Sequence, residues 1–166
     1  MKVLHISNKP VYPVLDGGCV AMSGTLECLK QLNYTIEHIC ISTIKHQFDT
    51  KAYPTDFRTQ AVEIDTSICP FAALKQLLIG RSYNISRFQT NAFKNIILET
   101  VQSTKFDLVI FDSLYCAVFI DEIRKHTSAK LVVRTHNVEY KIWSELAKSS
   151  SNPLKKWYLS TLSRQL

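Results

Sequence analysis

Hydrophobic and polar residues follow two spacings along this chain, one typical of strands and the other of helices. Short apolar runs favour buried strands, and apolar residues three or four positions apart favour amphipathic helices. Apolar runs predict five strands, at residues 2–7, 34–42, 61–65, 106–111 and 130–134. Helical spacing predicts helices at residues 19–32, 70–79, 86–101, within 113–125, and at 138–147 and 154–166.

Strands and helices therefore alternate along the chain. The segments "LVIF" (108–111) and "LVV" (131–133) are apolar at successive positions, so we expect both faces of these strands to be buried. A parallel sheet between two layers of helices meets this requirement, and right-handed crossovers then give a doubly wound topology. We predict an α/β, Rossmann-like three-layer fold with a mostly parallel central sheet, and a buried central strand at 130–134.

Turn and cap residues mark several predicted helix ends. Gly80 is expected to end the helix at 70–79, and Ser86 to cap the N-terminus of the helix that follows. Asn152 is expected to cap the last helix, because Pro153 suits the first helical position.

Composition narrows the class of protein. The chain has 166 residues, of which 46% are hydrophobic and 20% charged, as in a soluble globular protein with one domain. No apolar run is long enough to span a membrane, and "MKVLHIS" leads into a strand rather than a secretory signal. These features predict a cytoplasmic protein. The sequence stops within a helical pattern at Leu166, which predicts a single lobe (1–166) cut from a longer protein.

The five cysteines are odd in number and form no C-x-x-C pair, so we expect buried or half-buried free thiols rather than a disulfide framework or a zinc site. The net charge of +6 favours anionic partners, although most basic residues are scattered. The one local concentration includes Lys155 and Lys156, beside Trp157 and Tyr158. It would suit peripheral contact with the inner face of a membrane, packing against another lobe, or a solvated helix face. We expect no nucleic-acid partner.

Candidate chemistry gathers where the strands end, because open α/β sheets bind ligands beyond the carboxyl ends of their strands. Gly17 and Gly18 precede a helix whose free N–H groups would suit phosphate, and glycine permits positive φ and close approach. Asp112 follows the strand at 106–111. It could accept a hydrogen bond from a ligand hydroxyl, bind a metal or cap the next helix.

A second group of polar residues, Arg134, Thr135, His136 and Asn137, stands where the strand at 130–134 gives way to a helix. His136 is the most informative, because histidine can donate a hydrogen bond, transfer a proton or carry charge near neutral pH. Asn137 is expected to cap the following helix. The other histidines are predicted to be packing residues (His5 and His38) or surface residues (His46 and His126).

Two common nucleotide-binding patterns do not occur in the sequence. The first turn has no G-x-G-x-x-G, and no acid ends the strand at 34–42, which disfavours a nicotinamide-dependent oxidoreductase. The sequence also has no G-x-x-x-x-G-K for P-loop hydrolysis. A receiver domain would need clustered acids after the first strand, where Ser7, Asn8 and Lys9 stand instead.

Three segments in this order resemble the N-terminal lobe of a bacterial glycosyltransferase of the GT-B fold, close to family 4. They are "MKVLHISNKPVYPVLDGG", "FDLVIFDS" and "LVVRTHNVEYKIW", and the tail "NPLKKWYLSTLSRQL" is similar as well. The resemblance covers nearly the whole chain.

The resemblance implies an enzyme with two Rossmann-like lobes. The N-terminal lobe binds a sugar, lipid-linked or small-molecule acceptor, and the C-terminal lobe binds the nucleotide-sugar donor and carries an E-x₇-E motif. Transfer retains the anomeric configuration and needs no metal or other cofactor, since the nucleotide-sugar is a co-substrate.

The resemblance also implies roles for individual residues. His136 would be the catalytic residue that hydrogen-bonds the donor sugar near the reaction centre. Gly17 and Gly18 would approach the donor phosphates. Four further residues on the same edge are implied in donor or acceptor binding: Asp16, Asp112, Arg134 and Asn137.

This chain departs from the family in having no second Rossmann unit and no E-x₇-E motif in its expected context. We therefore expect an acceptor-side lobe that is inactive alone, has the donor-binding lobe of the same protein as its partner, and serves cell-surface polysaccharide synthesis. The alternative is a non-catalytic Rossmann-like binding or interaction domain. A downstream Rossmann unit with E-x₇-E in the same reading frame would favour the enzyme.

Overall fold

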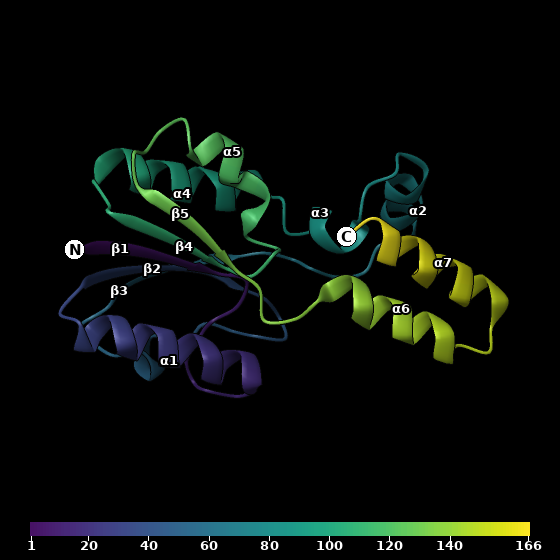
Figure 1. The fold of residues 1–166 in the computed structure, drawn as a ribbon, viewed down its shortest axis with the longest axis horizontal. Coiled ribbons are helices and arrows are strands. Elements are labelled where there is room, and N and C mark those ends of the chain that lie inside the picture. The colour runs from purple at the N-terminus through teal and green to yellow at the C-terminus, as the bar shows by residue number, and fades with distance from the viewer. The chain divides into compact units, whose positions relative to one another are not determined.

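A computed structural model describes residues 1–166 and arranges five strands in one sheet (Figure 1). The strands are β1 (Lys2–Ser7), β2 (Thr35–Ser42), β3 (Arg58–Glu63), β4 (Leu108–Asp112) and β5 (Lys130–Arg134). All neighbouring strands are parallel, in the order β3-β2-β1-β4-β5. This is the strand order of a doubly wound sheet, so the predicted Rossmann-like α/β fold is confirmed.

The chain divides into two units, a division that the hydrophobic pattern did not indicate. The sheet unit comprises Met1–Thr66 and Phe88–His136, and the helical unit comprises Ser67–Arg87 and Asn137–Leu166. The sheet unit holds all five strands together with the helices α1 (Gly17–Gln31), α4 (Asn91–Ser103) and α5 (Ile120–Ile123), and the short 3₁₀ turns η1 (Thr50–Ala52) and η2 (Ala117–Phe119). The helical unit holds α2 (Pro70–Leu78), α3 (Tyr83–Ser86), α6 (Glu139–Ser149) and α7 (Pro153–Arg164).

Helices cover both faces of the sheet, with α1 on one face and α4 and α5 on the other (Figure 1). Successive residues of a strand point to opposite faces, so β1 contributes to two separate cores. Val3 packs with Met22 and Leu26 of α1. Leu4 and Ile6 belong to the second core, which includes the large buried side chains Phe93, Phe106, Phe111 and Ile97.

The position of β5 differs from the prediction. We expected a buried central strand, but β5 lies at the edge of the sheet and pairs with β4 alone. Val132 and Val133 are 37% and 40% exposed. Apolar residues at successive positions therefore did not indicate burial here, because the strand has a neighbour on one side only. The prediction of a central strand is wrong.

The structure confirms the predicted helix ends at Gly80 and Asn152 and contradicts the one at Ser86. Gly80 follows α2 with a φ of 72°, a left-handed conformation that residues with a Cβ rarely adopt, so its predicted role is confirmed. Asn152 caps α7 by accepting hydrogen bonds from the first backbone N–H groups, also as predicted. The prediction for Ser86 is wrong, because Ser86 ends α3. Thr90 caps α4 instead, and its hydroxyl accepts from the N–H of Phe93.

Candidate functional site

The layer between the sheet and α1 changes from apolar to polar toward the carboxyl ends of the strands. Val3 and Ile36 belong to the apolar core under α1. Further along the same strands, His5 lies opposite His38, and both side chains are fully buried. Asp112 follows at the end of β4 and is fully buried as well. Polar side chains thus replace the core at the edge where parallel sheets bind ligands.

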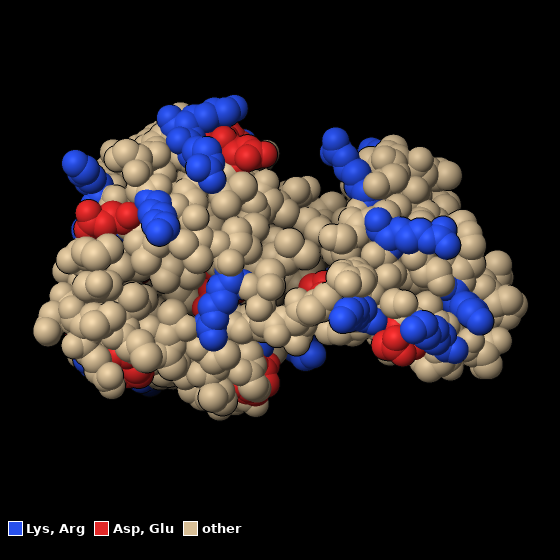
Figure 2. All heavy atoms as spheres, in the orientation of Figure 1, with Lys and Arg blue, Asp and Glu red and all other residues tan.

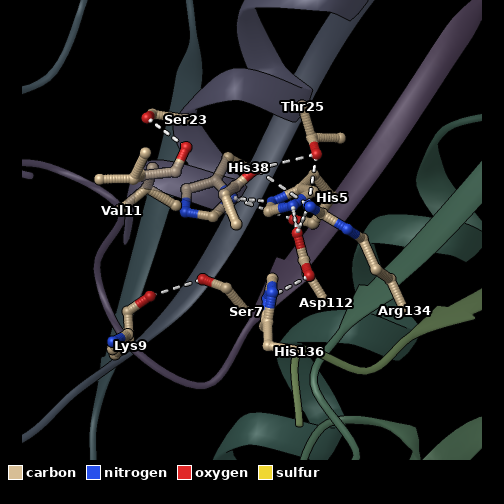
Figure 3. A network of polar contacts seen from close by, with 12 residues as sticks. His5, Ser7, Lys9, Val11, Ser23, Thr25, His38, Asp112, Arg134 and His136 are labelled. Carbon is tan, nitrogen blue, oxygen red and sulfur yellow. Dashed lines mark hydrogen bonds and ion pairs between the residues drawn. The ribbon is translucent and has the colours of Figure 1, made fainter. Parts of the chain in front are cut away.

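Asp112 lies at the centre of this polar cluster (Figure 3). Its Oδ2 lies 2.9 Å from His5 Nε2 and 3.3 Å from Arg134 Nη1. Its Oδ1 lies 2.6 Å from His136 Nε2. This last contact does not have the geometry of a hydrogen bond, so we describe it as a close ion-pair contact. Three basic side chains from β1, β5 and the turn after β5 thus converge on one buried carboxylate.

Burial alone would raise the pKa of Asp112, because it disfavours the charged carboxylate. The hydrogen bond with His5 and the charge interactions with His5, His136 and Arg134 outweigh burial, and the net pKa lies below its ordinary value. A depressed pKa means that the carboxylate contributes stability above the unfolded pKa of about 3.9, and that this contribution is lost as the pH falls through the folded pKa.

His5 and His38 extend the cluster into the core. Their Nδ1 atoms lie 2.9 Å apart, and His38 Nδ1 is also 3.2 Å from the carbonyl oxygen of His5. Because a carbonyl only accepts, His38 Nδ1 carries the proton and His5 Nδ1 accepts from it. Neutral His5 then holds its proton on Nε2 and donates it to Asp112. The prediction that both histidines are simple packing residues is wrong.

The spacing of polar residues in β1 could have indicated this cluster. His5 and Ser7 are two residues apart in β1, and Ser7 lies opposite Asp112 in the sheet register. Alternate strand residues share a face, so His5, Ser7 and Asp112 had to point the same way once β1 and β4 were known to pair. The pairing itself was not visible in the sequence.

His38 should make the protein sensitive to mild acid. Burial, followed by the electrostatic interaction with His5, holds the pKa of His38 well below its usual value of 6.5. Below about pH 6.5 the unfolded chain therefore binds a proton at His38 that the folded chain does not. The stability that neutral His38 contributes is present above that pH and is lost as the pH falls. We expect the free energy of unfolding, measured by urea denaturation, to fall by up to about 1.4 kcal/mol per pH unit below that point.

The matched variants are His38→Asn, which keeps a donor toward His5 but does not titrate, and His126→Asn at an exposed site. His38→Asn should flatten the pH dependence and His126→Asn should leave it unchanged. Equal slopes for the two variants would contradict this account.

Arg134 ties the end of β5 to α1. Its Nη1 donates to the carbonyl of Ala21, at 3.0 Å, and to the hydroxyl of Thr25, in addition to its ion pair with Asp112. Nη1 of the Arg134 guanidinium is therefore already bonded within the protein. Its predicted role in ligand binding stays a prediction.

The glycine pair forms the first turn of α1, which begins at Gly17 rather than at Cys19. Neither glycine uses the positive φ that its lack of a side chain permits. A Cβ on Gly18 would lie 3.1 Å from Lys9 Nζ and 3.2 Å from Asp16 Oδ1, whereas a Cβ on Gly17 would meet nothing within 4 Å. Gly18 therefore makes room for the Lys9–Asp16 ion pair. Gly17 leaves the start of α1 open.

Asp16 has a defined structural role at this helix start. Its Oδ1 accepts from the backbone N–H of Cys19 at 2.9 Å and from Lys9 Nζ at 2.6 Å. The hydrogen bond from Lys9, followed by that from Cys19, holds the pKa of Asp16 well below its ordinary value. A ligand phosphate here would meet the Asp16 carboxylate as well as the positive end of the helix, and Lys9 is the cation placed to offset that repulsion.

Two substitutions of Asp16 distinguish how much the helix cap and the ion pair with Lys9 each contribute to stability. Asp16→Ala removes both and should lower the free energy of unfolding by about 1 kcal/mol. Asp16→Asn keeps a good cap and should cost less than about 0.5 kcal/mol, because the exposed ion pair contributes little. Urea denaturation of the two variants measures the difference. Equal losses would show that the ion pair, rather than the cap, stabilises this turn.

Asn137 does not cap α6, contrary to the prediction. The helix begins at Glu139, Val138 occupies the cap position, and no side chain makes a capping hydrogen bond there. A ligand-binding role for Asn137 stays a prediction.

A pocket of about 490 Å³ lies at the carboxyl ends of β2 and β3. Its lining includes the hydroxyl residues Ser42 and Thr43, the acids Glu63 and Asp65, and the ring of Phe48. The nearby His46 is half-buried rather than at the surface, and burial together with Lys9 and Lys45 lowers its pKa. The sequence predicted a strand that ends at residue 42 but did not predict this pocket.

No group of three or more His, Cys, Asp or Glu side chains is arranged to hold a metal ion. All five cysteines are free, as predicted, but Cys28 and Cys69 are exposed rather than buried or half-buried. Comparison with known proteins finds no matching family model, no matching curated protein and no matching solved structure.

Proposed function

We propose that this chain is the N-terminal, acceptor-side lobe of a retaining GT-B glycosyltransferase. The enzyme would transfer a sugar from a nucleotide-sugar to a glycan, lipid-linked or small-molecule acceptor in cell-surface polysaccharide synthesis on the cytoplasmic side of the membrane. The observation that carries the proposal is His136 held against buried Asp112. Asp112 ends β4, and the strand order reverses between β1 and β4, which is where doubly wound sheets bind their ligands.

The contact with Asp112 gives His136 a defined orientation. Nε2 of His136 lies 2.6 Å from Oδ1 of Asp112, and a carboxylate at this distance favours the tautomer that carries its proton on Nε2. Nδ1 makes no hydrogen bond within the protein, and the side chain remains 20% exposed. Neutral His136 could thus accept a hydrogen bond from a sugar hydroxyl through Nδ1, and protonated His136 could donate one. Both are suited to positioning a donor sugar while positive charge develops at its anomeric carbon.

The leaving nucleoside diphosphate needs stabilisation of negative charge. The start of α1 offers backbone N–H groups, an open Gly17 and the ammonium of Lys9. Asp112 is a poor candidate for the nucleophile or acid of a glycosidase, because it is fully buried and held by three basic side chains. These features favour transfer assisted by binding groups over chemistry by paired carboxylates.

The pocket at β2 and β3 supports an acceptor rich in hydroxyl groups. Carboxylates and hydroxyls, as supplied by Glu63 and Ser42, accept hydrogen bonds from sugar hydroxyls, and the ring of Phe48 could stack on the apolar face of a sugar. A pocket of this composition suits a glycan better than a flat apolar ligand.

The proposal is tested with the protein encoded by the complete reading frame. The purified protein is incubated with UDP- and GDP-sugars and an extract of membrane lipids and glycans, and released nucleoside diphosphate is measured with the mass of the product. Transfer from one donor with retained configuration is expected, and residues 1–166 alone should give none. Binding of an extract glycan without transfer from any donor would favour the non-catalytic binding domain.

A further inference from the structure

The entire net charge of the chain lies in the helical unit. The chain has 20 basic and 14 acidic residues. The helical unit contains eight of the basic and two of the acidic residues, a net charge of +6, so the sheet unit contains twelve of each and is neutral. Figure 2 shows blue Lys and Arg atoms over the helical unit, with little red on the same face. Residues 67–87 contain no acid at all.

Helix α2 in this unit turns its apolar stripe outward. Phe71, Leu74 and Leu78 are spaced three and four residues apart and therefore share one face. They are 85%, 54% and 79% exposed, and exposed Lys75 lies beside them. The half-buried residues of the helix are the smaller or less apolar ones on the opposite side, together with Leu77. An ordinary surface helix has the reverse arrangement, with its apolar stripe toward the core.

The residues flanking α2 extend this surface, with Ile68 76% and Ile79 53% exposed and basic Arg81 following. The first turn of α7 repeats the combination, because Leu154 is 77% and Trp157 58% exposed beside Lys155 and Lys156. Apolar and aromatic side chains among basic ones are typical of helices that lie in the interface of a bilayer. No helix of the structure has the length and hydropathy needed to cross a membrane.

We propose that the helical unit docks on the surface of an anionic lipid bilayer through the outer face of α2, defined as Phe71, Leu74, Lys75 and Leu78. The apolar side chains enter the boundary between headgroups and acyl chains, and the basic residues of the unit attract anionic headgroups. The charge of the unit favours a lipid surface, because the unit carries the whole net positive charge of the chain and has only two acidic residues to offer a basic partner. The inference does not depend on the glycosyltransferase assignment.

The test is flotation of the chain with lipid vesicles. Vesicles of phosphatidylcholine and phosphatidylglycerol in a ratio of about 3:1 are compared with pure phosphatidylcholine, each at low and high salt. We expect binding to the anionic vesicles only, weakened by salt. The triple variant Phe71→Ser, Leu74→Ser, Leu78→Ser should bind at least about tenfold more weakly, because the apolar contribution is lost. Lys75→Glu with Arg81→Glu should weaken binding by about tenfold or more.

Matched controls come from the neutral sheet unit. Leu32→Ser removes a side chain that is 60% exposed there, and Lys51→Glu with Lys125→Glu reverses two exposed charges. Both should bind vesicles as the unaltered chain does. Circular dichroism verifies that the α2 variants keep their helices, as expected for exposed side chains.

Three results would overturn the proposal: equal binding to neutral and anionic vesicles, no binding to either, or α2 variants that bind like the controls. Self-association of the chain that the triple variant abolishes, without vesicle binding, would also overturn it and assign the face to a second copy.

Discussion

Replacing Asp112 with alanine is expected to lower the free energy of unfolding by about 3 to 5 kcal/mol. The carboxylate is fully buried and contacts three side chains: His5, Arg134 and His136. Its removal leaves the Arg134 guanidinium without its counter-charge, and the fully buried Nε2–H of His5 loses its acceptor and cannot regain water. Urea denaturation of residues 1–166 at neutral pH, followed by circular dichroism, measures the loss.

Two comparisons make this result specific. Asp112→Asn keeps the shape and an acceptor for His5 but removes the charge, so it should cost less, about 1 to 3 kcal/mol. Asp121→Ala, at an exposed position in the first turn of α5, should change stability by no more than about 0.5 kcal/mol. If Asp112→Ala were no more destabilising than Asp121→Ala, the carboxylate would not be the centre of the cluster.

Replacing His136 with alanine in the complete protein is expected to lower kcat of sugar transfer by about 10²- to 10³-fold. The effect should fall on kcat more than on KM, because the proposed hydrogen bond strengthens as charge develops in the transition state. Stability should change by less than about 1 kcal/mol, since the side chain is part-exposed and Asp112 keeps His5 and Arg134. Rates of nucleoside diphosphate release over a range of donor concentrations separate kcat from KM.

His126→Ala is the matched control, because His126 is exposed and contacts Gln102 rather than the cluster. It should leave the rate unchanged. His136→Gln, which retains a side chain able to donate and accept, should recover part of the activity. A His136→Ala enzyme that works within about threefold of the unaltered one would remove His136 from the mechanism, even if the protein proved to be a glycosyltransferase.

The sequence was most informative where local physics decides the outcome. The bounds of β1 and β5 match their apolar runs, and Gly80 and Asn152 end and begin helices because their backbone and side chain suit those positions. It was least informative about the order of the strands. The same apolar run can lie in the middle or at the edge of a sheet, which is why β5 was wrongly predicted to be central.

Some residues of the candidate site could be identified from the sequence, and others only from the tertiary structure. The sequence alone identified the carboxyl ends of the strands, His136 and Asp112, because a parallel sheet brings polar residues after its strands to one edge. Only the tertiary structure joined them to His5 and His38, residues far apart in the chain that meet because β1 lies between β2 and β4. Only the tertiary structure also shows that the apolar stripe of α2 is exposed. Periodicity fixes which side chains share a face, but the direction of that face depends on what the rest of the chain packs against it.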